Sequence, residues 1–213
     1  MIYIFDGIDA LEDDFHEKMK SLLSGERYSK IKRLRNPVGK KASAVVYLLL
    51  RAALCELYDI NEAVVFDYGK NNKPRLKKYP QIHFNLSHTK NAAACIVSDA
   101  EVGIDIQSIT SVQDKVAKRV LTDDEYAGFR ASDEPDVYFC EKWVIKESYA
   151  KKTGEGITVD FRNIPADTIK DCFVIRGKNY FCCANVSAAT GIGGKSIYQI
   201  RYIGRDDFER LHG

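Results

Sequence analysis

Hydrophobic and polar residues follow a helical period in some segments of the chain and a strand-like pattern in others. In the first half, amphipathic segments predict helices at residues 10–23, 26–34 and 37–58, and Pro37 is suited to open the last of them. Short apolar runs predict strands at residues 2–5, 64–66, 82–86, 92–97 and 102–106. Residues 99–101, between the last two runs, are typical of a hairpin connection.

The second half of the chain repeats this order of helices followed by strands. Helices are predicted at residues 112–120 and 133–152, and Thr122 with Glu125 forms a capping box that opens another helix between them. Strands are predicted at residues 172–175, 180–186 and 196–202. The repeated order of elements predicts an α+β fold of two related halves that meet near residues 100–110.

Composition narrows the class of protein without identifying it. The 213 residues are 45% hydrophobic and 29% charged, which is typical of a soluble globular chain of one large domain or two closely packed small ones. The longest apolar run, residues 44–50, is too short to span a membrane, and the first residues do not resemble a signal peptide. The six cysteines form no Cys-x-x-Cys pair and have no zinc-ligand spacing with the four histidines, so we expect free thiols in the cytoplasm.

Charge is close to balanced overall but uneven along the sequence. The formal net charge is only +2, which argues against a general binder of nucleic acid. Basic residues nevertheless gather in two segments, namely Arg27, Lys30, Lys32, Arg33, Arg35, Lys40 and Lys41, and then Lys70, Lys73, Arg75, Lys77 and Lys78. Local clusters on a nearly neutral protein favour a compact anionic ligand or an acidic protein partner.

Candidate chemistry lies in two motifs far apart in the sequence. The segment 143–151 places Glu147 and Lys151 one helical turn apart, and the segment 103–107 supplies Asp105. Two carboxylates that could share a divalent metal, beside lysines that could hold phosphate, point to phosphoryl-group chemistry. Taken alone, Glu147 and Lys151 are equally explained by a surface salt bridge worth about 0.2–0.5 kcal/mol.

Three further segments have short functional patterns. Residues 189–196 fit a relaxed phosphate-loop pattern, but a strand-like run follows where that loop requires a helix, so a glycine-rich hairpin is favoured. Residues 68–75 form a turn with three cations beside Pro74. Ser87 and His88 end a predicted strand, where they could hydrogen-bond a ligand.

The order of these segments resembles that of the Sfp-type (surfactin-synthetase-activating) 4'-phosphopantetheinyl transferases. The shared order is a basic helix, a Gly-Lys…Lys-Pro turn, Phe-Asn-Leu-Ser-His, Val-Gly-Ile-Asp-Ile and Trp-x-x-Lys-Glu-Ser-x-x-Lys, over residues 24–156. The resemblance implies transfer of the phosphopantetheine arm of coenzyme A to a serine of an acyl or peptidyl carrier protein, with release of adenosine 3',5'-bisphosphate. It also implies dependence on magnesium, with coenzyme A as substrate.

The resemblance also implies a fold and an arrangement of the site. Two structurally similar halves, related by a pseudo-twofold axis, would each contain a small antiparallel sheet packed with helices, and the active site would lie in the cleft between them. Residues 1–100 would bind the nucleotide end of coenzyme A. Residues 101–213 would hold the metal site, the catalytic helix and the carrier contact, for which the segment 157–165 is the candidate. Two fused halves would work as a monomer.

Site roles carry over from the family residue by residue. The resemblance assigns catalysis to Asp105, Glu147 and Lys151, and the metal to Asp105, Gln107 and Glu147. It assigns coenzyme A binding to Arg27, Lys30, Lys73, Pro74, Ser87, His88, Lys146 and Lys151. Helix presentation suits catalysis that depends on positioning.

The sequence departs from the family pattern at two places. Gln107 replaces a glutamate found in many relatives, so the metal site loses one formal negative charge and should hold magnesium less tightly. The Gly-Lys-Pro turn is interrupted, which leaves either Lys70 or Lys73 as the phosphate contact. Whether Lys40 or Lys41 adds a phosphate contact is likewise left open. The first departure leaves an alternative function, a catalytically degenerate protein that binds coenzyme A or a carrier.

Overall fold

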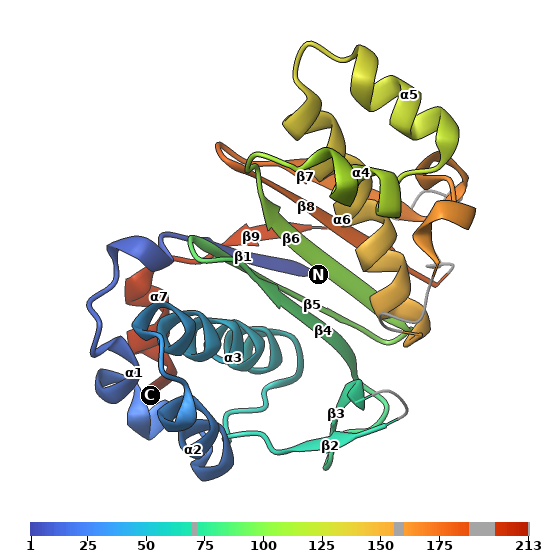
Figure 1. Cartoon of the computed structure of the whole chain (residues 1–213). Coiled ribbons are helices and arrows are strands. Elements are labelled where there is room, and N and C mark those ends of the chain that lie inside the picture. The colour runs from blue at the N-terminus through green and yellow to red at the C-terminus, as the bar shows by residue number, and fades with distance from the viewer. Residues whose placement is uncertain (70–71, 156–159, 188–198, 213) are drawn as a thin grey trace.

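The computed structural model describes residues 1–69, 72–155, 160–187 and 199–212 (Figure 1). The elements of the first half are β1 (Ile2–Asp6), α1 (Phe15–Lys18), α2 (Gly25–Arg33), α3 (Pro37–Tyr58), β2 (Phe66–Tyr68), β3 (Pro74–Leu76), β4 (His83–His88) and β5 (Ala92–Ser98). Those of the second half are β6 (Val102–Ser108), α4 (Asp114–Val120), α5 (Asp123–Ala131), α6 (Pro135–Thr153), β7 (Cys172–Arg176), β8 (Tyr180–Val186), β9 (Ile200–Tyr202) and α7 (Arg205–Glu209). Short 3-10 turns are η1 (Ile8–Ala10), η2 (Lys20–Leu22), η5 (Phe161–Asn163), η6 (Ala166–Thr168) and η8 (Arg210–His212).

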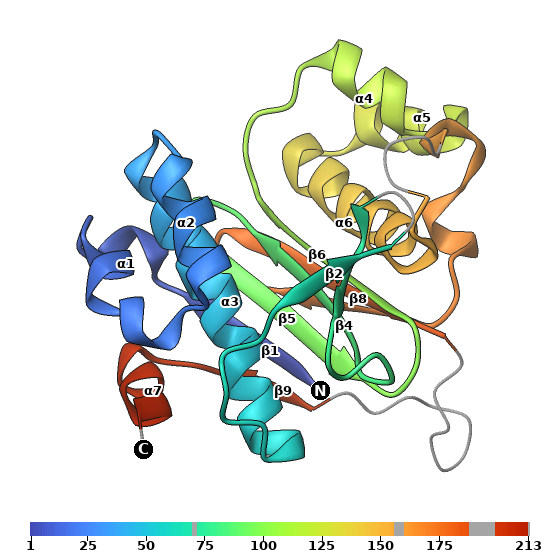
Figure 2. The same ribbon diagram turned by 90° about the horizontal axis from the view of Figure 1, so that it is seen from below.

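Two sheets pack against each other at the centre of the molecule, and a long helix covers the outer face of each (Figures 1 and 2). The strand order is β4-β5-β1-β9 in the first sheet and β6-β8-β7 in the second, while β2 and β3 form a separate ribbon. Ile4 and Ala94 of the first sheet share one buried cluster with Ile104 and Ala184 of the second. Helix α3 packs on the first sheet and α6 on the second. The predicted α+β class is confirmed.

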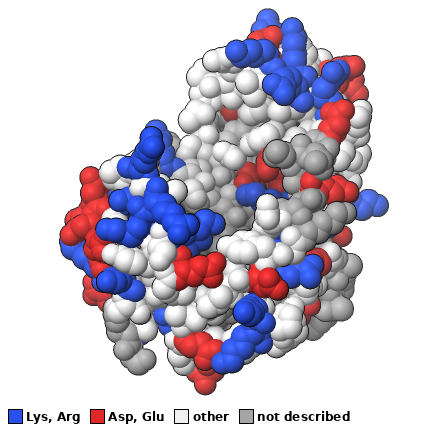
Figure 3. All heavy atoms as spheres, turned by 60° about the horizontal axis from the view of Figure 1, so that its bottom comes forward, with Lys and Arg blue, Asp and Glu red and all other residues white. Residues whose placement is uncertain are grey.

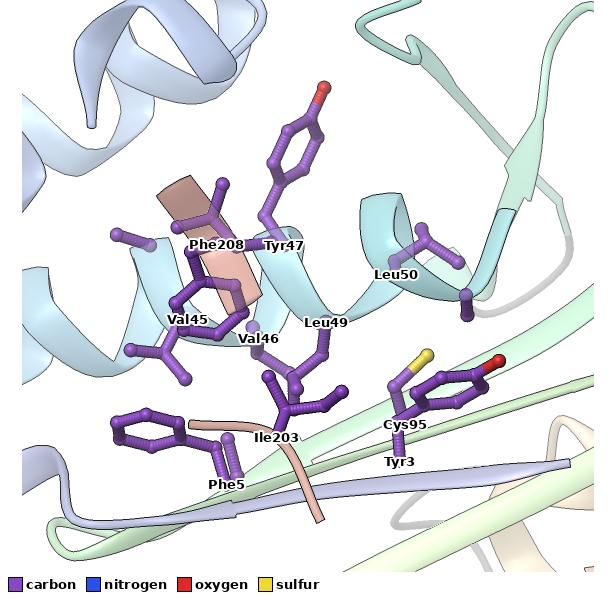
Figure 4. Packing of buried hydrophobic residues seen from close by; sticks show 14 of the residues in the cluster. Tyr3, Phe5, Val45, Val46, Tyr47, Leu49, Leu50, Cys95, Ile203 and Phe208 are labelled. Carbon is purple, nitrogen blue, oxygen red and sulfur yellow. The ribbon is translucent and has the colours of Figure 1, made fainter. Parts of the chain in front are cut away.

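Helix α3 has the bounds that its apolar face and Pro37 predict. The side chain of Asn36 accepts a hydrogen bond from the backbone N–H of Val38 at the start, and Asp59 ends the helix in the left-handed conformation. Figure 4 shows side chains of α3, Val45 and Leu49 among them, packed toward the first sheet. None of the helices in the described ranges, α3 included, is long and apolar enough to cross a membrane.

The helix predicted at residues 10–23 is wrong. In its place lie α1, of four residues, and the turns η1 and η2. Two buried cations of α3 hydrogen-bond carbonyl groups of this segment: Lys41 Nζ donates to the carbonyl of Leu11 at 2.8 Å, and Arg51 Nη1 donates to that of Leu22 at 2.9 Å. Because these carbonyls receive side-chain donors, the segment satisfies its backbone without a continuous helix.

The hairpin predicted at residues 99–101 is also wrong, because β5 and β6 belong to different sheets. Strand β5 pairs with β1 and β4, whereas β6 pairs with β8. The short connection therefore carries the chain from one sheet to the other. Local composition identified a tight connection correctly, but the partner of each strand depends on long-range packing that local composition does not encode.

The C-terminal end of the chain packs in the N-terminal part of the molecule (Figure 1). Strand β9 pairs in parallel with β1, and the ring of Phe208 on α7 stacks on that of Phe5 with centroids 5.5 Å apart (Figure 4). The spatial grouping of elements therefore differs from a simple division at residues 100–101. The predicted glycine-rich hairpin at residues 189–196 lies outside the described residues.

Candidate active site

The centre of the site lies between the edge strands of the two sheets. Asp105 on β6 is 2% exposed, and its Oδ1 accepts a hydrogen bond from Ser87 Oγ on β4 at 2.8 Å. Lys151 on α6 donates from Nζ to the same Oδ1 at 2.6 Å and to Ser87 Oγ at 2.9 Å. Three elements thus bring a buried carboxylate, a hydroxyl and an ammonium group together.

Side chains of β4 bridge the two sheets. Asn85 Oδ1 accepts the backbone N–H of Ile104 at 3.0 Å, and Ser87 Oγ accepts that of Ile106 at 3.3 Å. These two acceptors satisfy N–H groups of β6, which is an edge strand of its sheet in the described part of the chain. Sequence reasoning missed Asn85. Its signal was the alternation of two small polar residues, two positions apart, in an otherwise apolar strand.

Ser87 contacts other residues of the site, while its predicted contact with coenzyme A stays a prediction. The residue is 7% exposed, and its hydroxyl donates to Asp105 while it accepts from Ile106 and Lys151. A hydroxyl has one proton to donate and two lone pairs that accept, so these three bonds use it fully. Ser87 orients Asp105 and joins the sheets.

Glu147 lies one helical turn before Lys151 on α6 and belongs to the same electrostatic group. Burial raises the pKa of Glu147, the charge of Asp105 raises it further, and the charge of Lys151 opposes both. Gly103 explains how α6 comes so close to β6, because a methyl group there would overlap the backbone of Ser148 and Lys152. The motifs at 103–107 and 143–151 thus meet in space.

Gln107 completes the polar surroundings of Asp105. Its Nε2 donates to Asp105 Oδ2 at 3.2 Å, so both carboxylate oxygens have donors. Within the described ranges, no cluster of three or more His, Cys, Asp or Glu residues could hold a metal. The predicted ligands Asp105, Glu147 and Gln107 are two carboxylates and one amide, so only two of them are acidic. This set still fits magnesium, which prefers oxygen ligands and needs one or two carboxylates from the protein.

A second part of the site contains Arg27 and His88. Arg27 donates from Nε and Nη2 to the carbonyl of Ser43 at 3.2 and 2.8 Å, and burial lowers the pKa of its guanidinium. His88 is an exposed residue, yet desolvation by neighbouring protein atoms lowers the pKa of its imidazole. A backbone hydrogen bond at Thr89 opposes this shift, and the charges of Arg27 and Lys151 lower the pKa further. His88 is thus within electrostatic reach of both the basic helix and the Asp105 group.

The other predicted cations of the basic segment differ in exposure. Lys30 is exposed on α2, and Figure 3 shows Lys and Arg side chains gathered over this helix, beside a hollow in the surface. Lys41 is 5% exposed, and its ammonium lies 3.2 Å from Asp13 in addition to its bond to Leu11. Of the undecided pair Lys40 and Lys41, only the half-buried Lys40 therefore stays a candidate for phosphate contact.

The position of Lys146 does not support its predicted role in binding coenzyme A. Lys146 is fully buried on another face of α6, where Nζ donates to Glu125 Oε2 at 2.5 Å and to the carbonyls of Val120 and Phe161 at 2.9 Å each. An ammonium group has three N–H donors, and all three have partners inside the protein. Burial lowers the pKa of Lys146, and the hydrogen bond and charge of Glu125 oppose that shift. Its position in the motif did not distinguish a structural lysine from a ligand-binding one.

Lys73 also has partners inside the protein. Its Nζ donates to Glu101 Oε2 at 2.6 Å and to the carbonyl of Lys152, near the end of α6, at 2.8 Å. Pro74 begins β3, so the last two residues of the turn predicted at 68–75 belong to a strand. Lys70, the alternative phosphate contact, lies outside the described residues. The roles of Lys73 and Pro74 in binding stay predictions.

Two adjoining hollows lie beside the Asp105 group and share Val116 and Trp143 in their walls. One, of about 590 Å³, reaches Glu147, and the other, of about 390 Å³, reaches Gln107. Phe161 and Arg162, from the segment predicted to meet the carrier, line the larger one. Glu147 and Gln107, two of the predicted metal ligands, therefore each line a cavity between α4 and α6.

Comparison with known proteins agrees with this geometry. The model of the 4'-phosphopantetheinyl transferase superfamily matches residues 101–190, which include β6 and α6. The 4'-phosphopantetheinyl transferase psf-1 of Bacillus pumilus is 30% identical over 158 residues, which cover 73% of this chain and 68% of that protein. The enzyme gsp of Aneurinibacillus migulanus is 28% identical over 194 residues (82% and 81%), and Sfp of Bacillus subtilis strain 168 is 26% identical over 152 residues (70% and 68%). Motifs, site geometry and relatives agree, and the chain belongs to the 4'-phosphopantetheinyl transferase superfamily.

Proposed function

We propose that this chain transfers the 4'-phosphopantetheine arm of coenzyme A to a serine of an acyl or peptidyl carrier protein. The observation that carries the proposal is the convergence of Asp105, Glu147 and Lys151, two carboxylates and a cation from distant motifs, in a chain of this superfamily. This combination suits a reaction at a pyrophosphate, where catalysis depends on positioning and on charge stabilisation.

In the proposed reaction, the serine oxygen of the carrier attacks the phosphorus that bears the pantetheine arm. The phosphorus–oxygen bond to the nucleotide breaks, and adenosine 3',5'-bisphosphate leaves with the bonding electrons. Glu147 accepts the proton of the serine, and its raised pKa makes the carboxylate a better base than an exposed glutamate. Lys151 leaves Asp105 to donate hydrogen bonds to the departing phosphate.

We propose that magnesium is required, held by the carboxylates of Asp105 and Glu147 with the amide oxygen of Gln107. When bound, the ion would neutralise charge on the pyrophosphate. Ser87 keeps Asp105 oriented for this task through its bond to Oδ1. The donor set supports the proposal because every member offers an oxygen ligand.

The nucleotide end of coenzyme A is proposed to lie against Arg27, Lys30 and His88. The charges of Arg27 and Lys151 both act on His88, so this region can bind a negatively charged phosphate close to Lys151. Lys40 and the turn at Lys73 and Pro74 are further candidate contacts. The proposed carrier contact is the wall of the larger cavity at Phe161 and Arg162.

The finer features of the fold are proposed on the same basis. Residues 1–100, completed by β9 and α7, would form one half and the rest of residues 101–213 the other, related by a pseudo-twofold axis, with the reaction in a cleft between them. The two sheets, each covered by one long helix, support this arrangement. The protein would work as a monomer in the cytoplasm, a compartment that suits its six free cysteines.

The test is incubation with coenzyme A, magnesium and several apo carrier proteins, followed by intact-protein mass spectrometry. We expect a carrier heavier by one phosphopantetheine. Glu147→Gln should abolish the mass gain, whereas Glu141→Gln, a matched change on the same helix, should not. No gain with any carrier, combined with tight binding of coenzyme A, would favour the degenerate binding protein instead.

A further inference from the structure

Lys151 occupies the position beside Asp105 where a metal ion is expected. Its ammonium lies 2.6 Å from Asp105 Oδ1 and 2.9 Å from Ser87 Oγ. The carboxylate of Asp105 is 2% exposed, so water does little to stabilise its charge. In the metal-free protein, Lys151 is therefore the cation that balances this buried carboxylate.

A divalent ion and Lys151 cannot both remain at Asp105 without cost. Two cations that contact one carboxylate oxygen repel each other strongly in a partly buried site. The other oxygen, Oδ2, accepts from the amide of Gln107 at 3.2 Å, so an approaching ion meets a donor there as well. Metal binding at Asp105 consequently requires that Lys151 move.

The surroundings of Lys151 allow that movement. Its side chain is 28% exposed, whereas Lys146, which has three partners inside the protein, has no exposed surface. Lysine has a flexible four-carbon stem, so its ammonium can reach a new acceptor without movement of the helix. Asp105 and Ser87 lie on strands, and Ser87 is further held by the N–H of Ile106 at 3.3 Å.

We propose that Lys151 is an exchangeable internal cation. It neutralises Asp105 in the free protein, keeps divalent ions from binding tightly there, and transfers to phosphate when coenzyme A arrives with the metal. This inference rests on the proposed function for the arrival of coenzyme A, but its first half concerns the free protein alone. Metal and coenzyme A should therefore bind together rather than in separate steps.

The test measures Mn²⁺ binding to the free protein, without coenzyme A, from the electron paramagnetic resonance signal of unbound Mn²⁺. Mn²⁺ shares magnesium's preference for oxygen ligands. We expect Lys151→Met and Lys151→Gln to bind Mn²⁺ roughly tenfold or more tightly than the natural protein, because a competing positive charge is removed. Lys151→Arg keeps the charge and should remain weak. Lys152→Met is the matched control, because its ammonium lies 3.4 Å from the carbonyl of Val186 and not at Asp105.

Circular dichroism checks that each variant is folded. If Lys151→Met does not fold, Lys151→Gln provides the Mn²⁺ affinity of a neutral variant. An unchanged or weaker Mn²⁺ affinity in the folded neutral variant overturns the inference, as does an equal gain in Lys152→Met. The transfer assay separates the two proposals. Normal carrier modification by the natural protein without a gain in Mn²⁺ affinity rejects the inference alone, whereas a gain without carrier modification rejects the transferase alone.

Discussion

Two buried carboxylate–lysine pairs lie on different faces of α6, and they differ in how completely their partners are satisfied. Lys146 lies 2.5 Å from Glu125, and Lys151 lies 2.6 Å from Asp105. Glu125 also accepts the backbone N–H groups of Thr122 and Ala166, so that pair joins α5, α6 and the segment that follows α6. The two ion pairs thus have similar N–O distances but differ in their remaining capacity to bind further partners.

Exposure separates the two pairs further. Neither member of the Glu125–Lys146 pair is more than 6% exposed, whereas the side chain of Lys151 is 28% exposed beside Asp105. For Glu125, burial acts to raise the pKa, but the hydrogen bonds from Lys146, Ala166 and Thr122 outweigh it and lower the pKa. The closed pair stabilises the fold, while the accessible pair can exchange partners. Neighbouring lysines in one motif can therefore have unrelated roles.

Lys146→Met should produce the largest change, because it leaves Glu125 buried without its cation. We expect a loss of about 3–5 kcal/mol in the free energy of unfolding, measured by urea denaturation. Lys151→Met should cost only about 1–2 kcal/mol, since Ser87 and Gln107 still donate to the two oxygens of Asp105.

The double variant Glu125→Gln/Lys146→Met checks the cause of this loss. It removes the buried charge, so part of the lost stability should return. Equal losses for Lys146→Met and Lys151→Met would remove the distinction between a closed and an accessible pair.

Gly103→Ala should have the next largest effect, and it tests how α6 presents both pairs. The added methyl group meets the backbone of Ser148 and Lys152, so the helix must shift. We expect a loss of about 1–3 kcal/mol in unfolding free energy. Displacement of Glu147 and Lys151 by about 1 Å should lower turnover by roughly 100-fold, measured as the rate of carrier modification. Normal turnover would show that the close contact is not needed for catalysis.

Glu147→Gln should stabilise the free protein while it abolishes turnover. The pKa of Glu147 is raised, so its favourable contribution is present below the ordinary glutamate pKa and is lost as pH rises through the raised value. At pH 7.5 the variant should therefore be more stable by about 0.5–1 kcal/mol, and the difference should shrink toward pH 5. Thermal unfolding at both pH values measures this, and a stability difference independent of pH would contradict it.

Gln107→Glu should have the smallest effect and should make the accessible pair more receptive to metal. It replaces a donor to Asp105 with a third carboxylate. The magnesium concentration for half-maximal transfer should fall by about threefold, because added ligand charge raises affinity. An unchanged or higher requirement would place residue 107 outside the metal's surroundings.

Long or continuous patterns in the sequence predicted the fold well. The helix predicted at 133–152 is α6, Pro135–Thr153, and the strand predicted at 180–186 is β8 with the same bounds. The capping box of Thr122 and Glu125 is confirmed, and all six cysteines are free thiols. These features depend on local spacing or composition, which a single sequence contains.

Features that depend on distant partners could not be predicted in the same way. Lys41 and Arg51 donate to carbonyls of a segment more than 25 residues upstream, which forms turns in place of the predicted helix. No local pattern in the sequence indicates that these two side chains point toward that segment. The site shows the same limit, because the motif grouped Lys146 with Lys151 although Glu125 holds one of them in the core. Helix α7 was missed, although Asp207, whose carboxylate accepts the N–H of Gly204, was a visible signal for its start.

The pairing of β9 with β1 has a consequence for folding during synthesis. The first sheet contains residues from position 2 onward, yet its fourth strand is Ile200–Tyr202, and Phe208 fills part of its core. A ribosome makes the N-terminal part first, at about 5–20 residues per second, so this part must wait for most of the chain before it can complete its sheet. The second sheet, with β6, β7 and β8 between positions 102 and 186, has all its strands earlier. The second sheet can thus be completed before the first sheet, although most strands of the first sheet are synthesised earlier.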